Sequence, residues 1–505
     1  MSDSRPPIFD DGGGLPDVDR SRRRTDPGGP GSAEKTVWDS DDDDDWHGPN
    51  YLARRAIVVA LVVAVIAVAA VLVGRIIGSD DSGSGSGFGN ADWNNVVTVD
   101  NNSGTVVVTN AQGEETNRFR FGLSSLADTE VIGSTLISVD ADALAVVPLD
   151  AEAEITIADD VTTVEIASTG TLLRPSGSAQ TVVAQNTSSE RLVMVHGPTG
   201  EVIDTLATDP VPGARYDLAN ARTEPDGRHV LVTDTGNFQS VLFSFDRNGP
   251  SFFPGLALAV NNDIVVTAVN VGTNANVAVF DHAGEPGVSA RTSSVRAGMI
   301  SSDRVILVGI DGDVLGLALS DGDITELGSL SIGTVEFGDV ATRGDRLVVV
   351  GELGTALIDA DGTIVTELPG ARPTTSGVDE LAPRRTTCLT VERETAGELA
   401  VIDFETGTVG AEALASSDVL GTVDGCQPIV PTSAGYLSLT AEAVSPVTLV
   451  GDVIAISPDG GTIGVERANR LELLPRVTAN PTDDADAIEP VDVGRSGRQI
   501  FFAEL

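Results

Sequence analysis

The stretch HVLVTDTGNFQSVLFSFDRNGPSFFPG, residues 229–255, contains the pattern that decides the fold of this chain. Short runs of valine, leucine and phenylalanine alternate with turns rich in glycine, asparagine and aspartate, which is the composition of strands joined by tight turns. Further copies of the same order of strands and turns begin at Asp263, Arg304 and Arg346. The chain is therefore predicted to contain a repeated all-β unit.

The spacing of the repeats predicts how the units are assembled. Other copies begin near Val96, Leu136, Val182 and Cys388, and the turn glycines Gly249, Gly284, Gly322, Gly362 and Gly407 lie 35, 38, 40 and 45 residues apart. A period of roughly 40 to 45 residues with about four short strands is typical of β-propeller blades. One small sheet cannot bury both of its faces alone, so such units stack until the ring closes.

The number of blades is harder to predict than the fold, because counting the copies gives nine or ten units. Propellers usually have about four to eight blades. We therefore expect an all-β fold with a single propeller of seven or eight blades over residues 91–505, in which some units share a blade. The terminal segment QIFFAEL, residues 499–505, is expected to complete a blade begun near Val96.

Two short motifs carry a family resemblance. EPDGRHVLVTDTG (224–236) and SPDGGTIGVE (457–466) resemble the SPDGxxxxV element of TolB-like and YVTN-type propellers, which belong to the WD-repeat-like superfamily. The Pro-Asp-Gly sequence supplies a tight turn before a buried strand. The Trp-Asp dipeptide of WD repeats is missing, and DFETGTV (403–409) is similar to the quinoprotein repeat without its tryptophan. The resemblance implies an architecture and identifies no subfamily.

The N-terminal part predicts a membrane anchor. Residues 56–74, AIVVALVVAVIAVAAVLVG, are 19 uncharged residues, and a helix of that length spans about 28 Å, close to the thickness of a hydrocarbon core. We predict a transmembrane helix over residues 54–77. Arg54 and Arg55 precede it, whereas Asp80 and Asp81 follow it closely. By the positive-inside rule, residues 1–50 are cytoplasmic and the large domain is extracytoplasmic, at the cell membrane.

The segments on either side of this helix have the composition of unfolded chain. Residues 1–50 combine glycine and proline with the acidic run Asp41–Asp45, which Trp38 and Trp46 flank, so a disordered acidic tail is expected. Residues 78–90, GSDDSGSGSGFGN, are predicted to be a flexible linker. The acidic segment Asn480–Pro490 is expected to be a surface loop. The lipid bilayer is thus the first predicted partner of this chain.

The charge and the cysteines restrict the function further. Residues 78–505 carry 62 acidic against 22 basic side chains, a net charge of −40, which repels phosphate backbones and disfavours nucleic-acid binding. The two cysteines, Cys388 and Cys426, begin equivalent strands one repeat apart. On an oxidising side of the membrane they could form a disulfide, with two buried thiols as the alternative.

Catalytic and metal-binding motifs are missing from the sequence. His196, His229 and His282 have no metal-site spacing, and each is expected to be a surface or turn residue, His282 in a hairpin turn. Calcium is the better metal candidate, because six aspartates put oxygen ligands into tight turns, although none completes an EF-hand and structural turns also explain them. They are Asp311, Asp313, Asp321, Asp323, Asp359 and Asp361. No catalytic residue and no cofactor is predicted.

Three functions remain open. The leading hypothesis is a non-enzymatic, membrane-tethered propeller that acts as a protein-interaction or ligand-sensing platform with a partner in the cell envelope, because function on propellers sits in the loops. The alternative is an extracytoplasmic hydrolase or lyase that uses carboxylates at the mouth of the channel, where buried acids with raised pKa values would converge. The third is signalling through the helix to a basic cytoplasmic partner of the tail.

Overall fold

The computed structural model divides the chain into two compact units, Met1–Gly83 and Ser84–Leu505, and every described residue belongs to the second. The described residues are 93–120, 128–139, 143–149, 162–166, 172–178, 180–186, 188–208, 211–341, 345–373, 388–393, 398–410, 413–414, 428–432, 435–439, 444–447, 451–457, 462–475, 491–495 and 498–503. The predicted tail, transmembrane segment 54–77, linker, loop Asn480–Pro490 and Cys426 all lie outside them. Within these ranges, no helix has the length and apolar character that crossing a membrane requires.

The described residues form ten antiparallel sheets, nine with four strands and one with three. The first sheets comprise β1 (Asn95–Asp100), β2 (Thr105–Asn110) and β3 (Glu115–Arg120) with β39 (Gln499–Ala503); β4 (Asp128–Ile132), β5 (Thr135–Val139), β6 (Ala143–Pro148) and β7 (Thr162–Glu165); and β8 (Leu172–Leu173), β9 (Thr181–Gln185), β10 (Leu192–His196) and β11 (Glu201–Asp204). The short helix α3 (Thr205–Thr208) follows β11.

The central sheets are the most regular ones. They comprise β12 (Tyr216–Thr223), β13 (His229–Asp234), β14 (Gln239–Ser244) and β15 (Ser251–Pro254); β16 (Leu256–Val260), β17 (Ile264–Val271), β18 (Asn274–Asp281) and β19 (Pro286–Ser293); β20 (Val295–Ile300), β21 (Arg304–Gly309), β22 (Asp313–Ala318) and β23 (Ile324–Ser329); and β24 (Val335–Val340), β25 (Arg346–Gly351), β26 (Gly354–Asp359) and β27 (Ile364–Pro369). Each is a meander in which every strand pairs with the next one along the chain.

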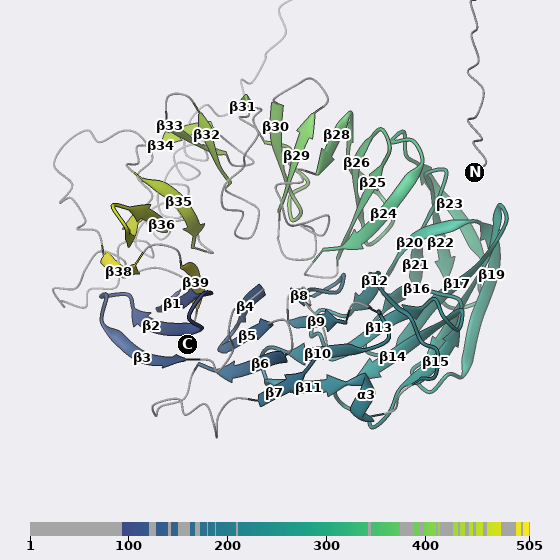
Figure 1. Ribbon diagram of the computed structural model, residues 1–505. Helices are drawn as coiled ribbons and strands as arrows, with labels where there is room; N and C mark the ends of the chain where they lie inside the picture. Colours follow the sequence, from purple (N-terminus) through teal and green to yellow (C-terminus); the bar gives the residue numbers. More distant parts are fainter. Residues whose placement is uncertain are drawn as a thin grey trace, which may run out of the picture. The chain divides into compact units, whose positions relative to one another are not determined.

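The last sheets continue the same order. They comprise β28 (Ala371–Pro373), β29 (Cys388–Arg393), β30 (Glu398–Asp403) and β31 (Ala413–Leu414); β32 (Ile429–Thr432), β33 (Gly435–Leu439) and β34 (Val444–Val447); and β35 (Asp452–Ile456), β36 (Thr462–Arg467), β37 (Arg470–Pro475) and β38 (Val491–Arg495). The final strand β39 lies beside β1 (Figure 1), with Phe501 opposite Val97. The prediction that QIFFAEL completes a sheet begun near Val96 is confirmed.

Both faces of the middle strands are buried, which explains their unbroken apolar runs. In β13, Val230 and Val232 pack toward the β8–β11 sheet, whereas Leu231 packs toward the β16–β19 sheet. The same alternation produces ten apolar clusters, each joining two successive sheets, and the last joins β35–β38 to β1 and β39. The packing order of the described sheets is therefore cyclic.

Four-stranded meanders packed face to face in cyclic order are the arrangement of a β-propeller, so the predicted fold class is confirmed. The ten described sheets exceed the seven or eight blades expected, and that blade number is not confirmed. The predicted turn glycines lie in the connections between third and fourth strands. Gly284, for example, has φ +90°, a conformation that glycine adopts without a steric penalty.

Candidate functional site

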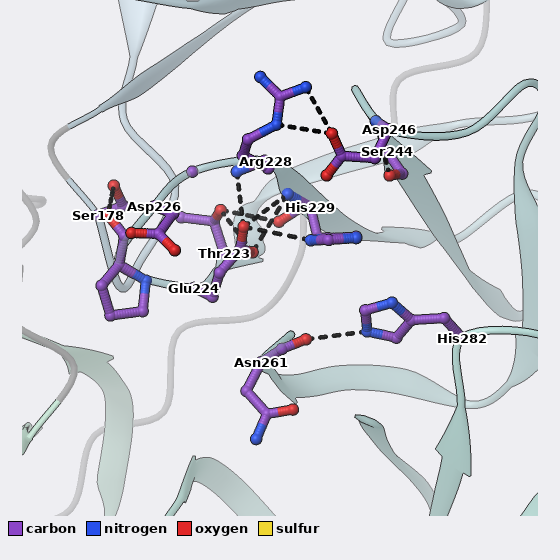
Figure 2. Close-up of polar contacts among 12 residues, drawn as sticks. Ser178, Thr223, Glu224, Asp226, Arg228, His229, Ser244, Asp246, Asn261 and His282 are labelled. Carbon is purple, nitrogen blue, oxygen red and sulfur yellow. Dashed lines mark hydrogen bonds and ion pairs between the residues drawn. The ribbon is translucent and has the colours of Figure 1, made fainter. Parts of the chain in front are cut away.

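The turn between β12 and β13 is organised around a buried carboxylate. Glu224 is 1% exposed, and its side chain accepts hydrogen bonds from the backbone N–H groups of Arg228 at 2.6 Å and His229 at 2.9 Å. Gly227 has φ +71° and closes the Glu-Pro-Asp-Gly turn by donating its N–H to the Glu224 carbonyl at 2.9 Å. Glu224 thus fixes the loop from which His229 enters its strand (Figure 2).

The second Pro-Asp-Gly motif shows that this turn does not require a carboxylate. Ser457 occupies the position of Glu224 and is equally buried. Its hydroxyl oxygen accepts the N–H of Thr462, five residues ahead, at 2.8 Å, as Glu224 accepts that of His229. A neutral hydroxyl therefore performs the same capping, and the negative charge of Glu224 is an addition that costs desolvation energy.

Two histidines lie beside this carboxylate. The Nδ1 atom of His229 is 3.3 Å from a Glu224 oxygen, and the centroids of the His229 and His282 rings are 4.5 Å apart (Figure 2). His282 lies in the turn between β18 and β19, and its Nε2 is 2.9 Å from the carbonyl oxygen of Asn261. Burial and the nearby His229 lower the pKa of His282. The pair therefore links the loops of two neighbouring sheets.

The third histidine of the domain reaches the same turn from the other side. The Nε2 atom of His196 is 3.0 Å from the Asp226 carbonyl oxygen, and its Nδ1 is 2.8 Å from Thr199 Oγ1. His196, His229 and His282 are all buried, so the expectation of surface side chains is wrong, although His282 does lie in a turn. In each sheet, the connection between the first and second strands and the connection between the third and fourth strands lie at the same end. Those of adjacent sheets meet there, which buries the histidines. Three successive sheets thus contribute one histidine each.

Arg228 adds a charged network above this cluster. Its guanidinium contacts Glu201 at 2.7 Å and Asp246 at 2.6 Å, and its carbon lies 5.8 Å from the centre of the Phe245 ring. Hydrogen bonding with Asp246 and Glu201 raises the pKa of Arg228, and the same bonds lower the pKa values of both carboxyl groups. Phe245 also lies 5.5 Å from the His196 ring.

A buried arginine, Arg222, joins the first strands of several sheets. β12 lies against β16, β16 against β20, and β20 against β24. Arg222 in β12 donates to the carbonyl oxygens of Leu258 at 3.2 Å and Gly338 at 3.4 Å, and its Nη1 is 3.7 Å from Asp339 in β24. A cavity of about 80 Å³ adjoins Arg222 and Glu224. Two buried acidic residues lie near this cavity. Glu224 accepts backbone N–H groups, and Asp339 faces the Arg222 guanidinium.

The opposite end of the β12–β15 sheet presents an apolar surface. Phe238 in the β13–β14 turn is 86% exposed and has φ +56°, a strained conformation for a residue other than glycine. Asp234 holds this turn by accepting the N–H groups of Gly236 at 3.0 Å and Asn237 at 3.3 Å. Exposed Leu256, Val269 and Val271 lie at the same end of the adjoining β16–β19 sheet. These four apolar side chains are called the Phe238 surface below.

The residues predicted to bind calcium or to form a disulfide belong neither to the histidine cluster around Glu224 nor to the Phe238 surface. Asp321 and Asp361 accept backbone N–H groups of Asp323 and Thr363 within their own turns, and Asp359 contacts Arg346 at 2.7 Å. Asp311 and Asp313 lie in the β21–β22 turn and at the start of β22. Among the described residues, no three His, Cys, Asp or Glu side chains gather as a metal-binding group. Calcium binding stays a prediction.

The predicted disulfide is also untested by the described residues. Cys388 begins β29, as expected from the repeat, and is buried against Val430 and Leu439 of the next sheet. Cys426 lies outside the described residues. The pairing of the two cysteines therefore stays a prediction.

Comparisons with known proteins identify no family. No protein-family model and no curated protein matches the chain. Similar solved structures include AztD from Citrobacter koseri, with 12% identity over 81% of this chain and 99% of that one and a TM-score of 0.37. Dihydro-heme d1 dehydrogenase NirN has 14% identity over 83% and 77%, with a TM-score of 0.35. Hsv2 from Kluyveromyces lactis has 11% identity over 55% and 93%, with a TM-score of 0.32. Such low scores support no functional inference, and the fold rests on the pairing and packing described above.

Proposed function

We propose that the chain is a non-enzymatic, membrane-tethered propeller that binds a protein partner of the cell envelope outside the membrane. The tether rests on the apolar run 56–74 and the arginines before it. The observation that carries the binding role is Phe238, which is 86% exposed and held at positive φ by the Asp234 cap. Backbone strain of this kind costs about 1 to 3 kcal/mol and clusters at functional sites.

The chemistry of the surface specifies the partner. Aromatic anchors that enter a pocket dominate the energy of protein interfaces, and Phe238 lies at the same end of the strands as three exposed aliphatic side chains. Residues 78–505 carry a net charge of −40, so electrostatic steering favours a basic protein surface. The proposed partner therefore has an apolar pocket bordered by arginine or lysine residues.

The carboxylate-dependent hydrolase is not favoured by the geometry around the small cavity. Glu224 accepts backbone N–H groups and Asp339 faces Arg222 at 3.7 Å. Retaining and inverting glycosidases, for example, need two carboxyl groups that face a substrate across about 5 to 9.5 Å of open space. The cavity beside Arg222 has a volume of only about 80 Å³, whereas pockets for small molecules have about 300 to 1,000 Å³.

The test compares three full-length chains by crosslinking in native membranes followed by pull-down. Phe238→Gly removes the anchor and relieves the positive φ, so the protein should be as stable as the parent or more stable by up to about 1 kcal/mol. Phe252→Ser is the matched control, because Phe252 is an exposed aromatic residue on the outer strand β15.

The expected result is an envelope protein that the parent and Phe252→Ser capture and Phe238→Gly does not. Its capture should also weaken as salt is raised, because the proposed partner is basic. If the parent and Phe238→Gly capture the same proteins in equal amounts, the Phe238 surface is not the binding site and the proposal fails.

A further inference from the structure

A groove lies at the other end of the β12–β15 sheet, between the edge strand β11 and the turn that joins β14 to β15. Its volume is about 480 Å³, within the range of roughly 300 to 1,000 Å³ that small-molecule sites occupy. The Phe238 surface is at the opposite end of these strands. The groove is therefore a second site that does not depend on the proposed protein partner.

The floor of the groove is apolar and firmly packed. Ile203 lines the groove from β11, and Phe243 and Phe245 line it from β14 and the residue after it, whereas the Val202 side chain lies on the opposite face of β11. Phe243 is buried in the core cluster that joins the two sheets. The Phe245 ring is held between His196, at 5.5 Å, and the guanidinium of Arg228, at 5.8 Å. A largely pre-formed apolar floor of this kind fits a flat or branched hydrocarbon body.

The rim of the groove carries Arg247, a guanidinium outside the ion pairs of its neighbours, while the charges of Arg228, Arg247, Glu201 and Asp246 together cancel. The Arg228 charge is neutralised by Glu201 at 2.7 Å and Asp246 at 2.6 Å. Arg247 lines the groove and is exposed, and no carboxylate of the described residues lies within ion-pair distance of it. The domain as a whole carries a net charge of −40, so an anionic molecule needs a local cation in order to bind. A guanidinium beside an apolar floor is suited to bind a carboxylate or phosphate group.

From this arrangement we infer that the groove between β11 and the β14–β15 turn binds a small organic anion with an apolar body. The body lies on Ile203 and Phe245, and the anionic group contacts Arg247. The acidic surface elsewhere repels such a molecule, so binding requires this cation. Cationic or neutral molecules of the same shape gain no such contact.

The experiment titrates the full-length chain in detergent micelles with 4-fluorophenylacetate and follows the fluorine NMR signal. Empty micelles correct for partitioning of the compound. Parallel titrations use 4-fluorophenethylamine, which has a similar body and the opposite charge. The expected dissociation constant for the anion is on the order of a few millimolar, the affinity that ligand efficiency sets for a molecule of this size.

Two arginine variants locate the binding. Arg247→Gln should weaken binding of the anion by about tenfold, because it removes the charge and leaves the apolar floor intact. Arg291→Gln is the matched control, since Arg291 is an exposed arginine in β19, in the next sheet, and it should bind like the parent. Equal affinity of the parent and Arg247→Gln, equal affinity for the amine, or no binding at about 20 mM anion would each overturn the inference.

Discussion

Phe501 in the last strand lies opposite Val97 in the first strand, so the two ends of the described chain close one sheet. The neighbouring residue Ile500 packs against Trp93 in the apolar cluster that joins this sheet to β35–β38. This pairing completes the sheet and lets it pack against β35–β38, which buries apolar faces that an open array would leave exposed. The stability of the whole ring should therefore depend on a strand at the very end of the described sequence.

Ile500→Asp tests this closure. Placing a charge in the Trp93 cluster should cost about 3 kcal/mol or more, because a carboxylate is buried without a partner and apolar packing is lost. Gln499→Asp is the control, since Gln499 is exposed and should change the unfolding free energy by less than about 0.5 kcal/mol. Urea unfolding can be followed by Trp93 fluorescence in a chain with Trp38→Phe and Trp46→Phe. Equal midpoints for the two variants would mean that β39 is not needed for closure.

Much of this architecture was readable from the sequence because both faces of every middle strand are buried. The repeats that begin at His229, Asp263, Arg304 and Arg346 each start at or next to the second strand of a sheet. The pairing of β39 with β1 followed from an apolar segment left over at the end of the chain. Counting the copies in the sequence gave nine or ten units, and the described residues form ten sheets. The expectation of seven or eight blades came from the usual size of propellers and not from these residues.

The histidine cluster could not be read from the sequence in the same way. His196, His229 and His282 have no short-range spacing, because each comes from a different sheet. The sequence did contain a signal, because the three histidines lie at strand ends that the repeat places at the same end of the successive sheets. Glu224 carried a second signal, because it replaces the serine found at the same place in SPDG of residues 457–460. The groove was missed because the sequence does not show which strands lie beside Arg247, nor that none of the described carboxylates pairs with it.

Removing only Arg222 from the ion pair with Asp339 should lower the stability strongly, whereas replacing both residues should change it little. Arg222→Met leaves Asp339 buried without its guanidinium, and such a change costs about 3 to 5 kcal/mol. Replacing both residues, as Arg222→Met with Asp339→Leu, should recover most of that loss, because well-packed apolar residues often replace a buried pair without cost. A double-mutant cycle of urea unfolding measures the coupling. Additive losses would show that the 3.7 Å contact contributes no coupling energy.

The capping role of Glu224 predicts different effects for two substitutions. Glu224→Ala leaves the N–H groups of Arg228 and His229 without their acceptor and should cost about 1 to 3 kcal/mol. Glu224→Ser restores the residue found at Ser457, whose hydroxyl caps the equivalent turn, so it should be the more stable of the two. Thermal unfolding compares them, with Ser457→Ala as a reference for losing one cap. If serine is no better than alanine, the two turns are not equivalent.

His282 predicts how the stability of the domain depends on pH. Its pKa is lowered by burial first and then by the charge of His229, so the folded protein binds this proton less readily than the unfolded chain. As the pH falls below the ordinary histidine pKa of about 6.5, the unfolded chain gains a proton that the folded state does not. Stability should therefore decrease on acidification, with a slope of at most about 1.4 kcal/mol per pH unit for this one group.

The measurement is urea unfolding between about pH 7.5 and 5.5, a window that lies above the range in which Glu201 and Asp246 take up protons. Both carboxyl groups have lowered pKa values, so their contribution is lost only at lower pH. His282→Gln keeps a donor for the Asn261 carbonyl and should flatten the pH dependence, whereas His47→Gln should leave it unchanged. An unchanged slope in His282→Gln would show that the pH dependence of stability does not come from His282.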